Sequence, residues 1–208
     1  MDYLFIIAVL IFSVVLHEVS HGFVANYLGD PTAKNAGRLT LNPISHLDLF
    51  GSIILPAFLI LVSIVTKGGG IIFGWAKPVP VNPYYFRDQQ YGQLKVAMAG
   101  PASNLALALV FGLALRFLPP YFFSPAVAFI VSYIVFINII LAVFNLVPVP
   151  PLDGSHILFA FLPETMAEVK RFLYRYGFFI LFAVIFFWFQ WIVDITGFIF
   201  RAITGFSI

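Results

Sequence analysis

The sequence predicts an all-α, polytopic membrane protein with four to five transmembrane helices, folded as a single domain over residues 1–208. Of its 208 residues, 62% are hydrophobic and only 10% are charged, whereas soluble domains carry about 25% charged residues. The mean hydropathy is +1.01. Several apolar stretches also approach or exceed the roughly 20 residues that a helix needs to cross a bilayer.

Charge and cysteine content exclude other classes. The net charge of +2 is too small to indicate a nucleic-acid partner. The chain has no cysteine, so it has no disulfide framework, thiolate metal site or cysteine nucleophile. The first residues lack the basic region of a secretory signal peptide and include Asp2. We therefore expect this segment to remain part of the protein.

Four stretches qualify as spanning helices by length and apolarity. They are Tyr3–Leu28, Val96–Leu115, Pro125–Val147 and Gly177 to about Phe200. A fifth stretch, Phe50–Thr66, lies at the lower limit of length and contains Pro56.

The segments Ala36–His46 and Gly68–Pro83 are rich in Gly and Pro and are predicted to be extended chain. Two topologies follow. Either Phe50–Thr66 is a fifth crossing, or Phe50–Pro78 is re-entrant, with an extended or β-hairpin segment that returns the chain to the same face. The positive-inside rule slightly favours the re-entrant arrangement, because it gathers one more of the 11 Lys and Arg residues on one face.

The segment LHEVSHG, residues 16–22, places ionisable side chains in the first apolar stretch. Each costs about 2.5–3.5 kcal/mol at the centre of a membrane helix, and a bound metal ion would offset that cost. His17 and His21 are four residues apart, so they share one helix face. Glu18 beside them reaches a water on the same ion. Two His ligands and a Glu general base are typical of zinc hydrolases, so Zn²⁺ is the predicted cofactor.

A zinc hydrolase needs a third protein ligand. Most other acidic and His residues lie near helix ends or in polar loops, whereas Asp153 follows an apolar stretch and a cluster of prolines that breaks the helix. A broken membrane helix usually lines a functional cavity, so Asp153 is the predicted ligand. The alternative is that Asp153 only caps a helix. We expect His156 to be structural, near the ligands without being one, and His46 to lie in a loop.

Three segments carry a further pattern: HEVSH at residues 17–21, AGPASN at 99–104 and NLVPVPPLDG at 145–154. Together, and in this order, they resemble the signature of the site-2 protease family of intramembrane zinc metalloproteases. GRLTLNP at 37–43 gives weaker support. The chain is similar to compact members of that family without a PDZ domain.

The resemblance implies that His17, His21 and Asp153 bind zinc and that Glu18 is the base. It also implies that Asn104 and Asn145 bind substrate or steady the active-site region. An amide can hydrogen-bond an extended peptide, and an interhelical hydrogen bond is the alternative for both. In the family, the HExxH helix is antiparallel to the second motif's helix and parallel to the helix before the third. That relation also favours the re-entrant arrangement.

The function expected is hydrolysis of peptide bonds in or near the transmembrane segments of membrane proteins, in the lipid of the cell membrane, as in regulated intramembrane proteolysis. An unwound substrate is expected to pair with the extended segments Gly37–Pro43 and Gly70–Val81. Whether the protein forms a homo-oligomer is left open. One alternative is a metal-ion transporter, which would place ligands along a path, often within repeats; the sequence shows none. Others are a prenyl-protein type of zinc protease and a non-catalytic zinc-binding protein.

Overall fold

The computed structural model describes residues 3–48, 51, 54 and 76–206. Four of its helices are long and apolar enough to cross a membrane. They are α1 (Tyr3–Tyr27), α4 (Gly92–Phe117), α5 (Pro125–Asn145) and α7 (Ala167–Thr204). Over the described residues there is no strand, which confirms the all-α class and the four predicted spans. The last helix begins at Ala167 rather than Gly177.

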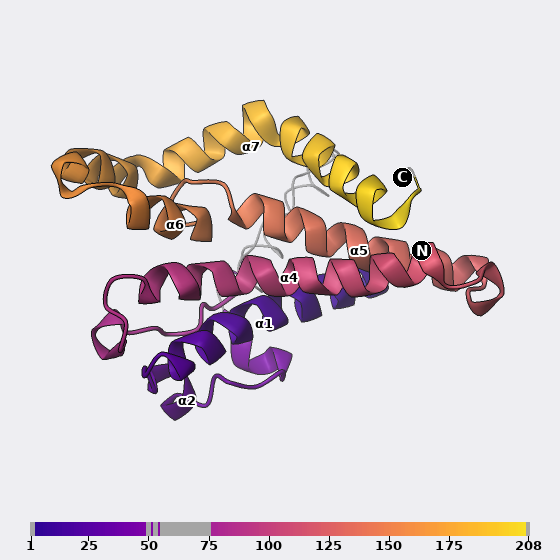
Figure 1. Cartoon of the computed structure of the whole chain (residues 1–208), viewed down its shortest axis with the longest axis horizontal. Helices are drawn as coiled ribbons and strands as arrows, with labels where there is room; N and C mark the ends of the chain where they lie inside the picture. The colour runs from indigo at the N-terminus through magenta and orange to yellow at the C-terminus, as the bar shows by residue number, and fades with distance from the viewer. Residues whose placement is uncertain (1–2, 49–50, 52–53, 55–75, 207–208) are drawn as a thin grey trace.

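The long helices lie side by side and alternate in direction along the chain (Figure 1). The helices α1 and α5 run one way, α4 and α7 run the other, and α4 contacts all three of its neighbours. Both termini lie at one end of the bundle. The opposite end carries the short helices α2 (Thr32–Asn35) and α6 (Asp153–Phe161). This is the relation between motif-bearing helices that the sequence resemblance implied.

Buried polar side chains join α1, α4 and α5 inside the bundle. The amide of Asn104 donates to Asn138 Oδ1 over 2.8 Å, and the amide of Asn138 donates to Ser13 Oγ over 3.0 Å. All three residues are buried. In a membrane, hydrogen bonds between helices supply part of the association that hydrophobicity supplies in water. The network therefore sets the register of α1 against α4 and α5.

Most of the segment Phe50–Pro78, predicted to be re-entrant or a fifth span, lies outside the described residues. Its flanks are described, and they pair: Lys77 N donates to His46 O over 2.9 Å. The five-crossing topology would put these two residues on opposite faces of the bilayer, whereas the structure holds them together. Of the segments expected to pair with substrate, Gly37–Pro43 and the described part of Gly70–Val81 form no strand.

The helix break predicted at the third motif is present. The helix α5 ends at Asn145, and α6 begins at Asp153 after a non-helical turn. A Cβ on Gly154 would lie 2.3 Å from Leu146 O, so the start of α6 packs directly on the backbone that follows α5. Only glycine allows this approach, and it fixes where Asp153 stands.

Candidate metal centre

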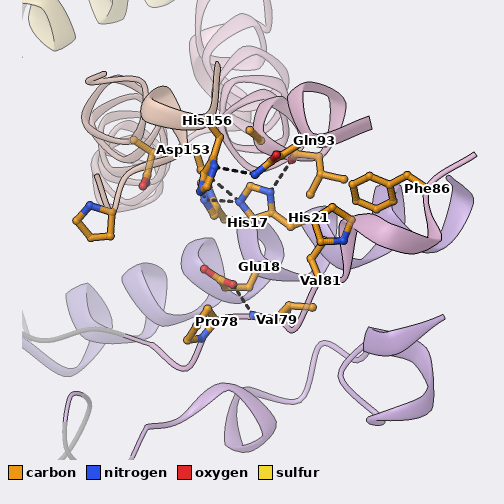
Figure 2. A pocket seen from close by; sticks show the side chains of 15 residues that line it. His17, Glu18, His21, Pro78, Val79, Val81, Phe86, Gln93, Asp153 and His156 are labelled. Atoms are coloured by element: carbon orange, nitrogen blue, oxygen red, sulfur yellow. Dashed lines mark hydrogen bonds and ion pairs between the residues drawn. The ribbon is translucent and has the colours of Figure 1, made fainter. Parts of the chain in front are cut away.

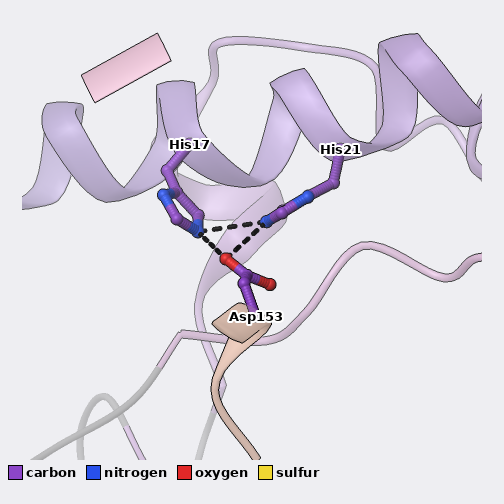
Figure 3. A group of neighbouring side chains, drawn as sticks. All are labelled: His17, His21 and Asp153. Atoms are coloured by element: carbon purple, nitrogen blue, oxygen red, sulfur yellow. Dashed lines mark hydrogen bonds and ion pairs between the residues drawn. The ribbon is translucent and has the colours of Figure 1, made fainter. Parts of the chain in front are cut away.

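His17 and His21 project from one face of α1 towards Asp153 at the start of α6 (Figure 3). The two Nε2 atoms lie 3.0 Å apart. Oδ2 of Asp153 lies 3.0 Å from Nε2 of His17 and 3.2 Å from Nε2 of His21. Ligand atoms at the corners of a tetrahedron around zinc are about 3.3 Å apart, given bonds of about 2.0–2.1 Å. The three predicted ligands therefore form a triangle of the size that zinc requires.

Hydrogen bonds behind the two histidines determine which ring nitrogens carry protons. Nδ1 of His17 faces Asn104 Oδ1 at 2.6 Å, and Nδ1 of His21 faces the Val96 carbonyl oxygen at 2.7 Å. Both partners are acceptors, so each Nδ1 donates. In a neutral imidazole this leaves a lone pair on Nε2.

Three lone-pair atoms therefore converge: two Nε2 atoms and one carboxylate oxygen. Oδ2 of Asp153 is buried and has no hydrogen-bond partner among the described residues. Without a cation among them, electron-rich atoms about 3 Å apart repel one another. The donor set, two imidazoles and a carboxylate, is one that catalytic zinc uses. These residues fit a zinc ion by both geometry and protonation.

The backbone of α4 leaves room for such an ion. A Cβ on Gly100 would lie 2.4 Å from His21 Nε2 and 2.5 Å from His17 Nε2. A methyl group there would occupy the space in front of both ligand atoms. Glycine at this position, in the second sequence motif, keeps the centre open.

Glu18 lies in the same cavity as the three ligands. The cavity has a volume of about 390 Å³, and Figure 2 shows Glu18 on one side of the two histidines. Oε2 of Glu18 accepts a hydrogen bond from the backbone N–H of Val79 over 2.9 Å. This contact aims the carboxylate into the space beside the ligands.

Val79 belongs to an extended segment, residues 76–82, that we call the strap. Residues that follow α1 in the chain form hydrogen bonds with the strap at several points. The buried guanidinium of Arg38 donates to Lys77 O over 2.8 Å, and Asn82 N donates to Asp30 Oδ2 over 2.7 Å. Pro78 and Val79 line the cavity. The strap thus fixes the hydrogen bond that Glu18 receives.

The two predicted asparagines have different surroundings. Asn145 lines the cavity, and its amide donates to Leu141 O of its own helix over 2.9 Å. Asn104 is fully buried and contacts His17, Ser13 and Asn138. Of these two asparagines, the structure therefore places Asn104 behind the predicted metal ligand His17 and Asn145 in the cavity.

Sequence reasoning did not single out several residues of the site. Ser13 and Asn138 were visible as polar residues in otherwise apolar stretches, but nothing local connects them to His17. Gln93, whose amide contacts His156 Nδ1 at 3.0 Å, gave no signal. His156 lies in the cavity wall, near the ligands as expected, while the predicted loop residue His46 is buried in a 3₁₀ turn.

Comparison with known proteins gives one family and several relatives. Residues 121–184 match the family described as Peptidase family M50. The chain is 39% identical over 188 residues to "Putative zinc metalloprotease YwhC" of Bacillus subtilis, an alignment covering 88% of this chain and 80% of that protein. It is 32% identical over 168 residues to "Putative zinc metalloprotease Rip2" of Mycolicibacterium smegmatis, covering 78% of this chain and 60% of that protein. No solved structure shows a significant match.

Proposed function

Because this chain belongs to peptidase family M50, a family of membrane zinc metalloproteases, we propose that it cleaves peptide bonds inside the bilayer, in or near the transmembrane segments of other membrane proteins. One observation carries the proposal. Three lone-pair atoms suited to zinc share a cavity with the carboxylate of Glu18. The substrate class, the cell membrane as the location and the roles of individual residues are parts of this proposal.

The depth of the site supports cleavage within the bilayer. His17 lies ten residues before the end of α1 at Tyr27, or about 15 Å along the helix axis at 1.5 Å per residue. Since a hydrocarbon core is about 30 Å thick, this position is near the middle of the span. A peptide bond that reaches Glu18 must therefore come from a segment at membrane depth.

Zinc held by His17, His21 and Asp153 would lower the pKa of water to about 7 and polarise the scissile carbonyl. Glu18 takes one proton from the attacking water, whose oxygen bonds to the carbonyl carbon. The C–N bond then breaks, and Glu18 delivers the proton to the leaving nitrogen. One water is consumed, and an acid and an amine are produced.

The asparagines act in two ways in this proposal. Asn145, in the cavity wall, binds the backbone of the unwound substrate through its amide. Asn104 holds the Nδ1–H of His17 and so keeps that ring in the tautomer a metal needs. It is a positioning residue, and a direct contact between Asn104 and substrate remains a prediction from the sequence.

The decisive experiment is cleavage of a panel of single-span membrane proteins by the wild type and by Glu18→Gln. Glu18→Gln should keep about one zinc per chain and lose cleavage, because the base is removed while both imidazoles stay. Glu168→Gln, the same change at an exposed residue of α7, is the control and should cleave normally. Near-wild-type cleavage by Glu18→Gln would overturn the assignment. Zinc binding without any cleavage by the wild type would favour the non-catalytic alternative.

A further inference from the structure

His156 shares the cavity of the metal centre and has no part in the mechanism above. It lies three residues after Asp153 in α6, so the two side chains share one helix face. In Figure 2, His156 and Gln93 lie on one side of His17 and His21, and Glu18 lies on the other. His156 and Glu18 thus line different parts of one cavity.

A contact with Gln93 orients this ring. The Gln93 side-chain amide nitrogen lies 3.0 Å from His156 Nδ1. An amide NH₂ only donates, so Nδ1 is the acceptor, and the proton of the neutral ring is on Nε2. Burial lowers the pKa of the His156 imidazole, which keeps the ring neutral at neutral pH. The Nε2–H is then the polar group that this cavity-lining ring can offer to a ligand.

We propose that His156 is a further catalytic residue, whose Nε2–H donates a hydrogen bond to the oxygen of the scissile carbonyl, and that Gln93 is the positioning residue that keeps the proton on Nε2. This inference rests on the proposed function. When water adds to the carbonyl carbon, negative charge develops on that oxygen, and a fixed donor stabilises it. His156 transfers no proton, so the balance of the reaction is unchanged.

The chemistry of the cavity favours this role over a merely structural one. Glu18 only accepts hydrogen bonds when ionised, and the imidazole nitrogens that face the centre carry lone pairs. Of the three histidines that line this cavity, His156 alone offers a ring N–H that is not already bonded to Asn104 or Val96. The amide of Asn145 also lines the cavity, but it donates to Leu141 O and is assigned above to the substrate backbone. Removing a single donor of this kind typically costs about 10²- to 10³-fold in kcat.

Three variants distinguish the effect of losing the Nε2–H donor from the effect of changing the packing of the side chain. His156→Asn keeps a polar group near the position of Nδ1 and loses the donor at Nε2. His156→Gln reaches further and restores a donor near that position. Gln93→Glu replaces the amide donor with a carboxylate that accepts from Nδ1–H, which favours the neutral tautomer with its proton on Nδ1 and a lone pair on Nε2. Gln90→Glu, the same change at an exposed residue, is its control.

We expect His156→Asn to lower kcat about 100-fold with KM and zinc content near wild type, and His156→Gln to recover most of that loss. Gln93→Glu should lower kcat, and Gln90→Glu should not. A second readout does not depend on activity. The chain has four histidines, so ¹⁵N-histidine NMR should resolve the His156 ring, identified by its loss in His156→Asn, as protonated on Nε2 in the wild type and on Nδ1 in Gln93→Glu.

Wild-type kcat in His156→Asn, or a wild-type ring protonated on Nδ1, would overturn the inference. In either case cleavage by the wild type would leave the proposed function intact. If the wild type cleaves nothing while Glu18→Gln and wild type hold equal zinc, the proposed function fails, and the catalytic role of His156 fails with it. If His156→Asn loses its zinc, His156 supports the ligands instead and the inference is wrong.

Discussion

The backbone of Gly100 lies so close to His21 that a Cβ added there would be 2.4 Å from the Nε2 atom of the histidine. The α4 helix thus forms one wall of the metal centre without contributing a ligand. Gly100 lets the α4 backbone approach both imidazoles, so α4 limits the space beside the predicted ligands.

Gly100→Ala should remove zinc even though Gly100 is no ligand, because the new methyl group would stand between the two imidazoles and the ion. We expect metal analysis of the purified protein to show most of the zinc lost. Gly197→Ala is the matched control, since a Cβ there meets nothing within 4 Å. Full zinc occupancy in Gly100→Ala would mean that the ion sits elsewhere.

Asp153→Ala should also lose most of the zinc, because it removes one of the three ligand atoms. The wild type should bind close to one zinc per chain. Asp194→Ala removes an exposed carboxylate on α7 and should change nothing. If Asp153→Ala keeps both its zinc and its activity, the third ligand is another residue.

Asn104→Ala should weaken zinc binding about 10- to 100-fold, the usual effect of removing a group that orients a metal-binding histidine. It should also lower thermal stability, since Asn138 loses a buried partner and an unpaired buried group costs about 1–3 kcal/mol. Asn145→Ala, by contrast, should raise KM at unchanged zinc affinity. A change in KM alone for Asn104→Ala would support the substrate-binding role that the sequence suggested.

Arg38→Ala should reduce kcat about 10- to 100-fold at unchanged zinc content. Arg38 holds the carbonyl oxygens of Lys77 and Pro78 in the strap, and the next residue supplies the N–H that orients Glu18. Small displacements of a catalytic group have effects of this size. Lys34→Ala, an exposed change nearby, is the control. Normal kcat in Arg38→Ala would show that the strap does not orient the base.

Lys34 and Arg87 should lie on the same, cytoplasmic face, since Arg87 N donates to Leu28 O over 2.8 Å at the end of the bundle near Lys34. The chain has no cysteine, so single substitutions give clean labelling sites. With an impermeant thiol reagent outside intact cells, Ser124→Cys and Arg201→Cys should react. Lys34→Cys and Arg87→Cys should react only after the membrane is opened. Labelling of these last two from opposite faces would support the five-crossing topology.

Local periodicity explains which features the sequence alone predicted. A 3.6-residue repeat puts His17 and His21 on one face, and uninterrupted apolar stretches show where helices cross. Hydropathy does not show where a helix ends outside the bilayer. Because residues 168–175 include several charges, hydropathy did not identify them as part of α7. The helix nevertheless includes them, since its backbone hydrogen bonds form within the helix and need no lipid.

The tertiary structure alone decided how the site is held. The contact from His17 to Asn104 spans 87 residues, that from Glu18 to Val79 spans 61, and that from His156 to Gln93 spans 63. No local repeat encodes such pairs, because they depend on how helices pack and how far their backbones approach. The sequence by itself predicted the types of the metal ligands and the helix that carries two of them. Packing decided their tautomers, the space kept by Gly100, and the orientation of Glu18, since each depends on atoms from a different segment.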